Sequence, residues 1–548
     1  MRLARRAFLS VSAAALAPAA IAALSGQSTF EVQHLGVAVT RLDMAEGYVT
    51  YGAPEMYQGQ DLNGDGDQED IVFHIYDLQS GRNRNTHLVS NSAGAVVEGW
   101  VAVPVQEQGE DLNEDGDVHD RVMHLVHAET GELINLKRAG LDSVHVGSRL
   151  FFPVVEDMQG MQDLNGNHTA ENQVLHAYDL ETRTLKNLRL ATDFAESGYQ
   201  SDGNRLAVRV FEHHQGVDFS GDGDQNDRTV LLVDLPGFQV TNTGLTAGGG
   251  LGFRLYPDLL LVDSYEVQQG ETDLNGDGEI SGEVTQLLNL RSGALWNLGQ
   301  DVVEILRRPD QAAYTISETL AGQDLNGDGD ALDRVLQIWT RERGTVNTGI
   351  AGGDLDWNEE YVAIQVHEGN HGQKDLNGNG TVYDSVLHLV SLRTGAVVNL
   401  ETSGPAYSLH GDHLLVSVAE SSSSDLNGDG DTLDLIAELI HIPTLERTNY
   451  GLAVGYAALR LSHRLGVLGV PEQAQGQDLD GDGTLGGTMY YAFELGAAPV
   501  ALGFGGEVVQ AWEIDSTHAA FRAREGHATG DLNGDGDTND QILTILKR

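Results

Sequence analysis

The sequence repeats, with small variations, the stretch Asp61-Leu62-Asn63-Gly64-Asp65-Gly66-Asp67, completed by Asp70, ten times along its 548 residues. The other nine copies begin at Asp111, Asp163, Asp218, Asp273, Asp324, Asp375, Asp425, Asp478 and Asp531. Consecutive copies are 50 to 55 residues apart, which is near the length of a four-stranded propeller blade and longer than most solenoid coils. The period therefore predicts a repeat protein in which each loop belongs to one structural unit.

The segments between the loops have the pattern of β-strands. Each loop is followed by a run rich in β-branched residues, such as 71–78, then a turn such as Ser80-Gly81, then a short strand carrying Asn, such as Val398-Asn399-Leu400. Two further strand-like runs complete the repeat, and the second ends just before the next loop, as in 206–212. Four strands per repeat predict an all-β fold, a β-propeller of about ten four-stranded blades.

The two ends of the chain predict how the propeller closes. The last repeat stops at Ile545-Leu546-Lys547-Arg548, without its Asn-type strand, and residues 32–36 align with that strand at 295–299. We therefore expect an N-terminal strand to complete the last blade, which leaves no open sheet edge. Ten blades exceed the usual four to eight, so two five-bladed propellers in tandem are the alternative. The midpoint, 289–294, reads as a turn inside a blade, which favours one continuous ring.

Each loop has the ligand spacing of a calcium site. Calcium takes six to eight oxygen ligands, and a loop with carboxylate or amide side chains at positions 1, 3 and 5 and Gly at position 6 wraps the ion. In the sixth copy Asp324, Asn326 and Asp328 hold those positions, followed by Gly329 and Asp330. The residues predicted to bind calcium are Asp61, Asn63, Asp65, Asp67, Asp70, Asp111, Asn113, Asp115, Asp117, Asp120, Asp163, Asn165, Asn167, Asp218, Ser220, Asp222, Asp224, Asp227, Asp273, Asn275, Asp277, Glu279, Asp324, Asn326, Asp328, Asp330, Asp333, Asp375, Asn377, Asn379, Asp384, Asp425, Asn427, Asp429, Asp431, Asp434, Asp478, Asp480, Asp482, Asp531, Asn533, Asp535, Asp537 and Asp540.

The loop pattern resembles the calcium loops of integrin α-subunit propellers and of thrombospondin type 3 repeats, which share an Asp-x-Asp/Asn-x-Asp-Gly core. The resemblance covers the loops and not the rest of the chain. It implies Ca²⁺ as the cofactor, at up to ten sites. The closing acid differs from the family pattern, because it falls at position 10 here, as in Asp70, rather than at position 9.

A glutamate ahead of the loop is a further candidate ligand. It lies five to seven residues before the first Asp in nine repeats, at Glu55, Glu156, Glu212, Glu266, Glu318, Glu368, Glu420, Glu472 and Glu525. In a hairpin this position sits across from the start of the following strand. We expect it to complete the coordination shell, directly or through water; the alternative is that it faces solvent at a strand end.

The ten loops are not equivalent, and about six are predicted to bind strongly. Asn167 and Asn379 replace the acid at position 5, and Gly282 and Gly487 replace the acid at position 10. Fewer charged ligands lower calcium affinity. The four loops that contain these residues are therefore predicted to bind weakly or to stay empty.

The acidity of the chain is concentrated in the loops. The sequence has 82 acidic and 32 basic residues, a net charge of −50, and the ten loops hold 36 of the acids and none of the bases. A net of −14 remains outside them. This balance disfavours nucleic acid and anionic membranes as partners. The chain has no cysteine, so metal ions are the candidate staples in place of disulfides.

Residues 1–24 are predicted to be a signal peptide, and the repeats occupy 30–548. Arg2, Arg5 and Arg6 precede an apolar stretch with a small-residue cleavage candidate at Ala20-Ile21-Ala22. The segment 5–9 resembles a twin-arginine export signal, with an ordinary secretory signal as the alternative. No later segment has 18 continuous apolar residues, so no membrane span is expected. We expect an exported protein, extracellular or at the periplasm or cell surface.

Four histidines occupy the same position in the strand after the loop, an arrangement that would suit a column of metal ligands. His74, His124, His176 and His388 share it, but other blades place residues such as Leu231 there. A structural column packed between blades explains this variation better. The recurring Asn of the short strand is interpreted in the same way, as a turn or inter-strand hydrogen bonder.

No established catalytic motif is found, because the sequence has no Gly-x-Ser-x-Gly elbow, phosphate loop or His-Glu-x-x-His helix. Local departures from the repeat include Arg307-Arg308, the stretch 357–360, and the pair His410 and His413; surface variation explains each equally well. Two function classes remain. The favoured one is a calcium-stabilised binding or structural module with an extracellular protein or glycan ligand, and the other is an extracellular enzyme acting on polysaccharide at the central channel.

Overall fold

The computed structural model describes residues 30–547 except 193–197, 236, 249–251, 277, 309–310, 341, 421–423, 456–457, 463, 506–511, 515–516 and 526–529. The predicted signal peptide lies outside this part of the chain. Within it the fold is all-β, and the helices are single turns: η1 (Met56–Gln58), α1 (Glu212–Gln215), η2 (Val267–Gln269), α2 (Glu318–Ala321), η3 (Glu368–Asn370) and α3 (Glu472–Gln475). None of these described helices is long and apolar enough to span a bilayer.

The chain packs into two compact units. The first consists of Met1–Ala95, Asp356–Gly369 and Gln373–Arg548. Its sheets have the strand orders β2-β3-β4-β5, β24-β25-β26-β27, β28-β29-β30-β31, β32-β33-β34-β35 and β1-β38-β37-β36. The strands are β1 (Glu31–Ala38), β2 (Leu42–Ala45), β3 (Tyr48–Pro54), β4 (Ile71–Asp77), β5 (Asn83–Val89), β24 (Gly353–Trp357), β25 (Tyr361–His367), β26 (Ser385–Ser391), β27 (Val397–Ser403), β28 (Tyr407–His410), β29 (His413–Ala419), β30 (Leu435–His441), β31 (Glu446–Ala453), β32 (Leu459–Leu461), β33 (Leu465–Pro471), β34 (Thr488–Glu494), β35 (Val500–Gly505), β36 (Trp512–Ile514), β37 (His518–Arg524) and β38 (Gln541–Lys547).

The second unit consists of Val96–Leu355 and Asn370–Gly372. Its sheets are β6-β7-β8, β9 to β12, β13 to β16, and a seven-stranded sheet from β17 to β23. The strands are β6 (Trp100–Gln106), β7 (Arg121–His127), β8 (Leu133–Ala139), β9 (Val144–Val146), β10 (Arg149–Val155), β11 (Gln173–Asp179), β12 (Thr184–Ala191), β13 (Tyr199–Ser201), β14 (Arg205–Phe211), β15 (Arg228–Asp234), β16 (Gln239–Thr246), β17 (Phe253–Tyr256), β18 (Leu259–Tyr265), β19 (Glu283–Asn289), β20 (Leu295–Arg308), β21 (Gln311–Ser317), β22 (Arg334–Thr340) and β23 (Gly344–Ala351).

These sheets confirm the predicted fold of ten antiparallel blades, with two irregularities. The seven-stranded sheet counts as two blades because β20 is the fourth strand of one and the first strand of the next. The blade of β6 to β8 has three strands, and only an isolated bridge between Val97 and Trp100 stands where a first strand was expected. The chain midpoint is the predicted turn inside a blade, closed by the bond from Asn289 N–H to Ala294 O at 2.8 Å.

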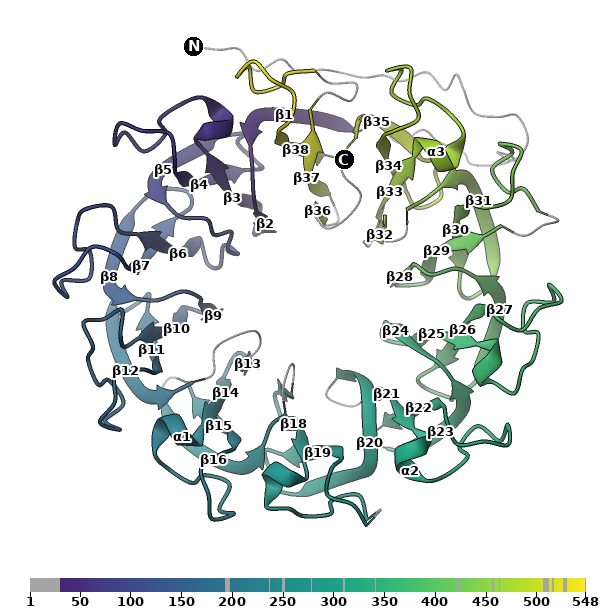
Figure 1. The fold of residues 1–548 in the computed structure, drawn as a ribbon, viewed down its shortest axis with the longest axis horizontal. Coiled ribbons are helices and arrows are strands. Elements are labelled where there is room, and N and C mark those ends of the chain that lie inside the picture. Colours follow the sequence, from purple (N-terminus) through teal and green to yellow (C-terminus); the bar gives the residue numbers. More distant parts are fainter. Residues whose placement is uncertain are drawn as a thin grey trace. The chain divides into compact units, whose positions relative to one another are not determined.

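The N-terminal strand completes the last blade, as predicted. Strand β1 pairs antiparallel with β38, from Glu31 opposite Lys547 to His34 opposite Thr544, and Figure 1 shows the two strands side by side. Two tandem propellers would each need to close within one half of the sequence. The pairing of the first strand with the last is incompatible with a division of the chain into two propellers at its midpoint.

Apolar side chains on both faces of the central strands hold neighbouring blades together. The second and third strands of each blade bury nearly every residue, as in β10 and β11. Phe151 and Phe152, adjacent on β10, point to opposite faces and join different clusters, one with Leu231 of the next blade and one with Met123 of the preceding blade. Each blade is therefore sandwiched, which is the reason the strands read as near-continuous apolar runs.

Candidate calcium centres

The ten Asp-rich loops join the second and third strands of the blades, and in five of them the residue at position 2 packs against a buried apolar cluster. Leu62, Leu164, Leu325 and Leu479 pack against the buried clusters between blades. Phe219 takes the same role in the fourth loop. Apolar anchoring fixes where each loop leaves the sheet, while the polar residues on either side stay at the surface.

The aspartate at position 1 folds the loop back on itself in all ten copies. In the first loop Oδ1 of Asp61 accepts the N–H of Gly64 at 2.6 Å, and Oδ2 accepts the N–H of Gly66 at 3.1 Å. The same pair of bonds occurs in the other nine loops. The loop backbone is therefore organised by its own carboxylates.

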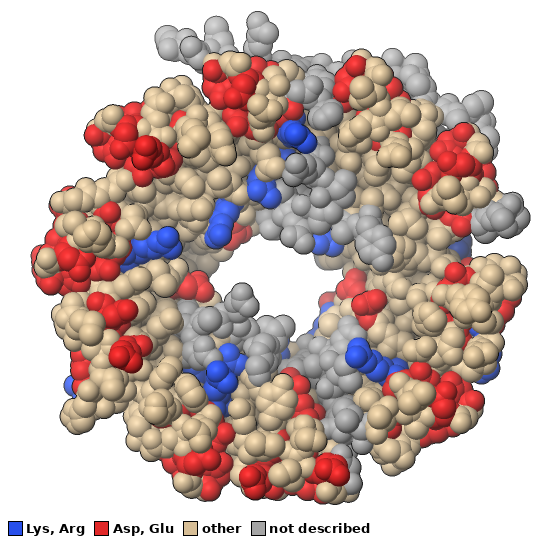
Figure 2. Space-filling model, viewed as in Figure 1, with Lys and Arg blue, Asp and Glu red and all other residues tan. Residues whose placement is uncertain are grey.

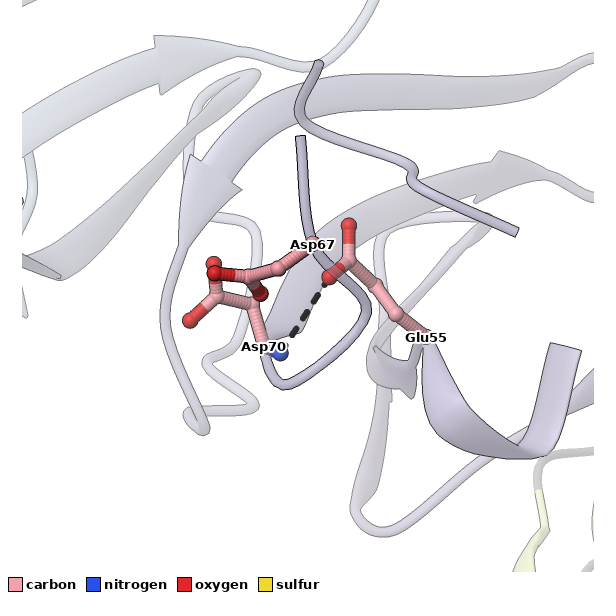
Figure 3. A group of neighbouring side chains, drawn as sticks. All are labelled: Glu55, Asp67 and Asp70. Atoms are coloured by element: carbon pink, nitrogen blue, oxygen red, sulfur yellow. Dashed lines mark hydrogen bonds between the residues drawn. The ribbon is translucent and has the colours of Figure 1, made fainter. Parts of the chain in front are cut away.

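The glutamate ahead of each loop is a buried clamp. Figure 3 shows Glu55 directed at the loop, where its Oε2 accepts the N–H of Asp70 at 3.2 Å. Its Oε1 accepts the N–H groups of Leu62 and Asn63. The bond from the N–H of position 2 to the glutamate is present in all ten loops. The alternative of a solvent-facing glutamate is wrong, because nine of the ten are buried and Glu420 is half-buried.

The tenth clamp is Glu107, which the sequence analysis missed. Its Oε1 accepts the N–H of Leu112 at 2.6 Å, and its Oε2 accepts that of Asp120 at 3.0 Å. Glu107 precedes Asp111 by four residues rather than five to seven, because this blade lacks the helical turn between clamp and loop. The sequence feature that identifies Glu107 as a clamp is its position directly after the strand Trp100–Gln106, and not its distance from the loop.

In two loops the clamp leaves a buried carboxylate oxygen without a donor. Eight clamps use Oε2 to accept the N–H of position 10, even where that residue is Gly282 or Gly487. Within the described part of the chain, Oε2 of Glu212 and Oε2 of Glu525 have no hydrogen-bond partner. Both residues are at most 1% exposed. A buried, unpaired carboxylate oxygen costs several kcal/mol unless a cation neutralises it.

The clamp and the acids of positions 7 and 10 converge. In the first loop carboxylate oxygens of Glu55, Asp67 and Asp70 lie within 4.8 Å of one another, as Figure 3 illustrates. Equivalent groups form in the loops beginning at Asp111, Asp324 and Asp425, and in the Asp218 loop the group is Asp222, Asp224 and Asp227. Such spacing suits several oxygens around one ion bound at 2.3–2.6 Å. Position 7 thus contributes its side chain to the acidic cluster.

The crowding of negative charge changes the acidity of position 10. Burial, with repulsion from neighbouring loop carboxylates, raises the pKa of Asp120 and Asp227 to about 7, and that of Asp333, Asp434 and Asp540 to about 6. A group of like charges that holds protons this strongly is also a group that a divalent cation would stabilise.

The recurring Asn of the outer strand supports the loop from its other side. In the first blade Nδ2 of Asn85 donates to the carbonyl of Leu62 at 2.8 Å, and its Oδ1 accepts the N–H of His87 at 2.7 Å. The bond from Asn to the position 2 carbonyl recurs in seven further blades. The Asn sits where the outer strand bulges, and His87 there has φ 59°. The interpretation as a hydrogen-bonding residue is confirmed, with the backbone of the Asp-rich loop as its partner.

In five loops the residue at position 3 also contacts the blade that follows. The amide of position 3 donates to the carbonyl two residues after the next clamp, in the helical turn between that clamp and its own loop. These bonds join Asn113 to Met158 (2.9 Å), Asn165 to His214 (2.9 Å), Asn326 to Asn370 (3.3 Å), Asn427 to Ala474 (3.3 Å) and Asn533 to Tyr57 (2.6 Å). A cation held by position 3 would therefore be tied to the interface between two blades.

A glutamine three residues after the clamp completes this interface. Gln475 is buried, accepts the N–H of Ala453 at 2.7 Å and donates to the carbonyl of Gly451 at 3.2 Å, both on the outer strand of the preceding blade. Gln215 and Gln269 bridge their preceding blades in the same way. The sequence E-x-x-Q-G thus carries two contacts, Glu to its own loop and Gln to the neighbouring blade.

The loop backbones fall into two classes. Position 6 has φ between 103° and 108° in the six loops predicted to be strong, as at Gly66 and Gly329, and between 72° and 91° in the other four, as at His168 and Gly483. Only the first class has Asp at position 7. The difference in geometry matches the predicted grouping, and the affinities themselves stay a prediction.

Three residues of the loops are not covered by the common pattern: Asp277, Asn172 and Ser220. Asp277, at position 5 of the loop that begins at Asp273, lies outside the described residues. At position 10 of the third loop stands Asn172, which the sequence analysis did not assign; its N–H bonds Oε2 of Glu156 at 2.9 Å and its side chain bonds Thr169. Ser220, at position 3 of the fourth loop, donates hydrogen bonds to Asp218 and Asp227. Its hydroxyl group therefore lies next to the acids of this loop.

The histidine register is structural where the structure describes it. His74, His124, His176 and His388 are buried, and Nδ1 of each bonds the carbonyl two residues earlier on its own strand. His74 also stacks on Tyr51, with ring centroids 5.3 Å apart. Burial lowers the pKa of His74 and His176 to about 4. His74 and His176 are therefore neutral packing groups.

The acids form separate patches at the surface. Figure 2 shows most Asp and Glu gathered in separate patches, with uncharged surface and some Lys and Arg between them. This distribution agrees with the sequence count, which placed the excess of acids in the loops.

No protein-family model matches the chain, and no curated protein matches it. Among solved structures, the β-propeller domain of the Trilobed protease from Pyrococcus furiosus is 9% identical, over 67% of this chain and 96% of that chain, with a TM-score of 0.30. BamB from Moraxella catarrhalis is 8% identical, over 75% and 100%, with a TM-score of 0.30. The tricorn protease is 11% identical over 89% of this chain, at a TM-score of 0.24, and the match spans 46%, about half, of that protein. Values this low carry no argument about function.

Proposed function

We propose that this protein is an exported scaffold whose blades are held in place by calcium, and that it acts as a binding or structural module for an extracellular protein or glycan. The observation that carries the proposal is the clamp: a glutamate, buried in nine of the ten cases, bonds the backbone of every loop, and in four loops the acids of positions 7 and 10 converge on it. In the loops of Glu212 and Glu525 one buried oxygen of this carboxylate has no donor among the described residues. A cation is the chemical species that fits such an oxygen.

Calcium is the ion that this donor set favours. The candidate ligands are carboxylate and amide oxygens in a flexible loop, which suit a hard cation that takes six to eight ligands. Mg²⁺ keeps much of its water and requires a tight octahedral geometry, and softer metals prefer imidazole or thiolate. At affinities of 10⁻⁴ to 10⁻³ M, typical of extracellular modules, each site would contribute on the order of 1 kcal/mol at millimolar calcium.

Several sites of this kind would together decide whether the fold is stable. The loops lie at the joints between blades, as the bond from Asn427 to Ala474 illustrates. Ion binding at such a joint stabilises the contact between neighbouring blades as well as one loop. This role suits a chain without cysteine. The only support for the enzymatic alternative is the propeller fold, and that fold is found in proteins of many unrelated functions.

The decisive experiment is a thermal melt of the mature chain in calcium, in chelator, and in chelator followed by excess Mg²⁺. We expect a large loss of melting temperature in chelator, recovery with calcium and little recovery with Mg²⁺. Equilibrium dialysis with ⁴⁵Ca counts the sites in the same samples. Equal melting temperatures with and without calcium would contradict the proposal.

The proposed export route has its own test. Replacing Arg5 and Arg6 by Lys keeps the charge and removes the twin-arginine pair, so we expect the precursor to accumulate inside the cell. Secretion at the normal level would assign the segment to the ordinary secretory route, and retention of both proteins in the cytoplasm would contradict export.

A further inference from the structure

Three histidines form a row across one blade, at the strand ends far from its calcium loop. His410 ends β28, His413 begins β29 and His441 ends β30, and the sheet register places His410 opposite His413 and His413 opposite His441. Residues directly opposite in an antiparallel sheet project from the same face, with Cβ atoms about 4.5–5.5 Å apart. We call these three residues the histidine row.

The histidine row lies at one end of a sheet face that is otherwise apolar. Leu415 and Leu439, two residues from His413 and His441 on the same strands, pack in the cluster shared with the next blade. His413 and His441 are only half-buried, so the row lies where this packed face opens to solvent. The loop that begins at Asp425 follows the other end of β29, and seven residues of strand separate the two by about 20 Å. The row is therefore independent of the candidate calcium centres.

The geometry of the two rings on β29 and β30 suits a shared metal ion. The ring centroids of His413 and His441 are 5.1 Å apart, with ring planes 49° from parallel. A ring centroid lies roughly 3.2 Å from a metal bound through its nitrogen at about 2.0–2.1 Å, so tetrahedral bonding places two centroids roughly 5.2 Å apart.

The protonation and orientation of these rings are also favourable. Nδ1 of His441 hydrogen-bonds Oγ1 of Thr444 at 2.7 Å, which fixes the ring and leaves Nε2 as the ligand atom, the arrangement found around metal-binding histidines. Burial, followed by the repulsion from nearby His441, lowers the pKa of His413. An imidazole must be neutral to bind a metal, and burial favours the neutral form of His413.

We propose that the histidine row is a second metal site, which binds one divalent transition-metal ion such as Zn²⁺, Ni²⁺ or Cu²⁺ through His413 and His441, with His410 as the third ligand. Imidazole ligands select these ions over Ca²⁺ and Mg²⁺. The site goes beyond the proposed calcium scaffold and does not depend on it. The proposed site also assigns a function to His410 and His413, two residues that differ from the repeat pattern.

The test is a Zn²⁺ titration by calorimetry of the full mature chain saturated with Ca²⁺, so that the acidic loops do not compete for the metal. The variants are His413→Gln, His441→Gln and His410→Gln, and the matched control is His213→Gln, an exposed histidine of α1. We expect one Zn²⁺ equivalent in wild type and control, at least a tenfold loss of affinity in His413→Gln and His441→Gln, and a smaller loss in His410→Gln.

Cu²⁺ supplies a spectroscopic readout of the ligands. Its electron paramagnetic resonance spectrum should show nitrogen coupling in wild type and in His213→Gln, and should lose it in His413→Gln. The calcium-dependent melting temperature should be equal in all variants, which shows that they are folded. Zn²⁺ binding that is unchanged in both His413→Gln and His441→Gln, or absent from wild type, would overturn the proposal.

Discussion

The carboxylate of Glu318 and the backbone of Asp333 are joined by a hydrogen bond of 3.1 Å from the Asp333 N–H to Oε2. The other oxygen accepts N–H groups at the start of the same loop, including that of Asn326 at 3.1 Å. One buried side chain thus holds both ends of the loop together, while its charge adds to that of Asp330 and Asp333.

The substitution Glu318→Gln separates these two roles. The amide keeps the shape, but its NH₂ group can no longer accept a bond from Asp333 and it removes the negative charge. We expect a loss of about 1–3 kcal/mol in the free energy of unfolding, together with weaker calcium binding at this one loop. Isothermal titration with calcium and urea unfolding measure the two effects. The exposed Glu342→Gln in the same blade is the control; equal calcium affinity and stoichiometry in both variants would show that Glu318 is no part of the site.

The two loop classes predict that calcium sites can be removed and created. Asp330→Thr gives the sixth loop the residue that Thr381 supplies in the seventh, and we expect it to lose one strong calcium equivalent. The double variant Asn379→Asp with Thr381→Asp makes the reverse change and should gain one. Each change should move calcium-dependent stability by about 1 kcal/mol. Dialysis with ⁴⁵Ca counts the sites, and identical counts in the three proteins would refute the ranking.

The sequence predicted what depends on spacing within a repeat and missed what depends on contacts between repeats. The spacing of residues such as Asp324 and Asn326 is the same in the repeats, so the loops can be aligned from the sequence alone. Glu107 was not recognised as a clamp because it lies only four residues before its loop. In the fold, the end of its strand nevertheless places it where the other clamps lie, and it bonds the N–H of Leu112. Gln475 had no signal, since its partners, Ala453 and Gly451, lie on another blade and only the fold brings them near.

That interface predicts a second stability effect. Gln475→Ala removes two hydrogen bonds to β31 and leaves the buried N–H of Ala453 without its partner. We expect a loss of about 1–3 kcal/mol, in calcium and in chelator alike, because the glutamine is not a candidate ligand. Gln473→Ala, exposed on the same turn, is the matched control and should change stability by less than about 0.5 kcal/mol. Chemical unfolding measures the free energy of unfolding of both variants. Equal values would show that the hydrogen bonds of Gln475 to β31 do not contribute to stability.

The buried histidines predict a pH dependence that differs from that of the loops. Burial lowers the pKa of His176 from 6.5 to about 4, so between these values the unfolded chain binds a proton that the folded chain does not. Stability from this residue is therefore complete above pH 6.5 and falls as the pH drops toward 4, by on the order of 2 kcal/mol at pH 5. Leu231 occupies the same register in the next blade, which makes His176→Leu the natural substitution.

The variant His176→Leu should consequently gain stability relative to wild type as the pH falls. Protonation of the loop carboxylates would weaken the proposed calcium binding in both proteins alike. The quantity to measure is therefore the difference in unfolding free energy between them at pH 7.5 and at pH 5, in saturating calcium. The exposed His213→Gln should show no such change with pH. A variant-minus-wild-type difference that is constant from pH 7.5 to pH 5 would mean that His176 is protonated in the folded protein, and the structural role of the column would then have to be given up.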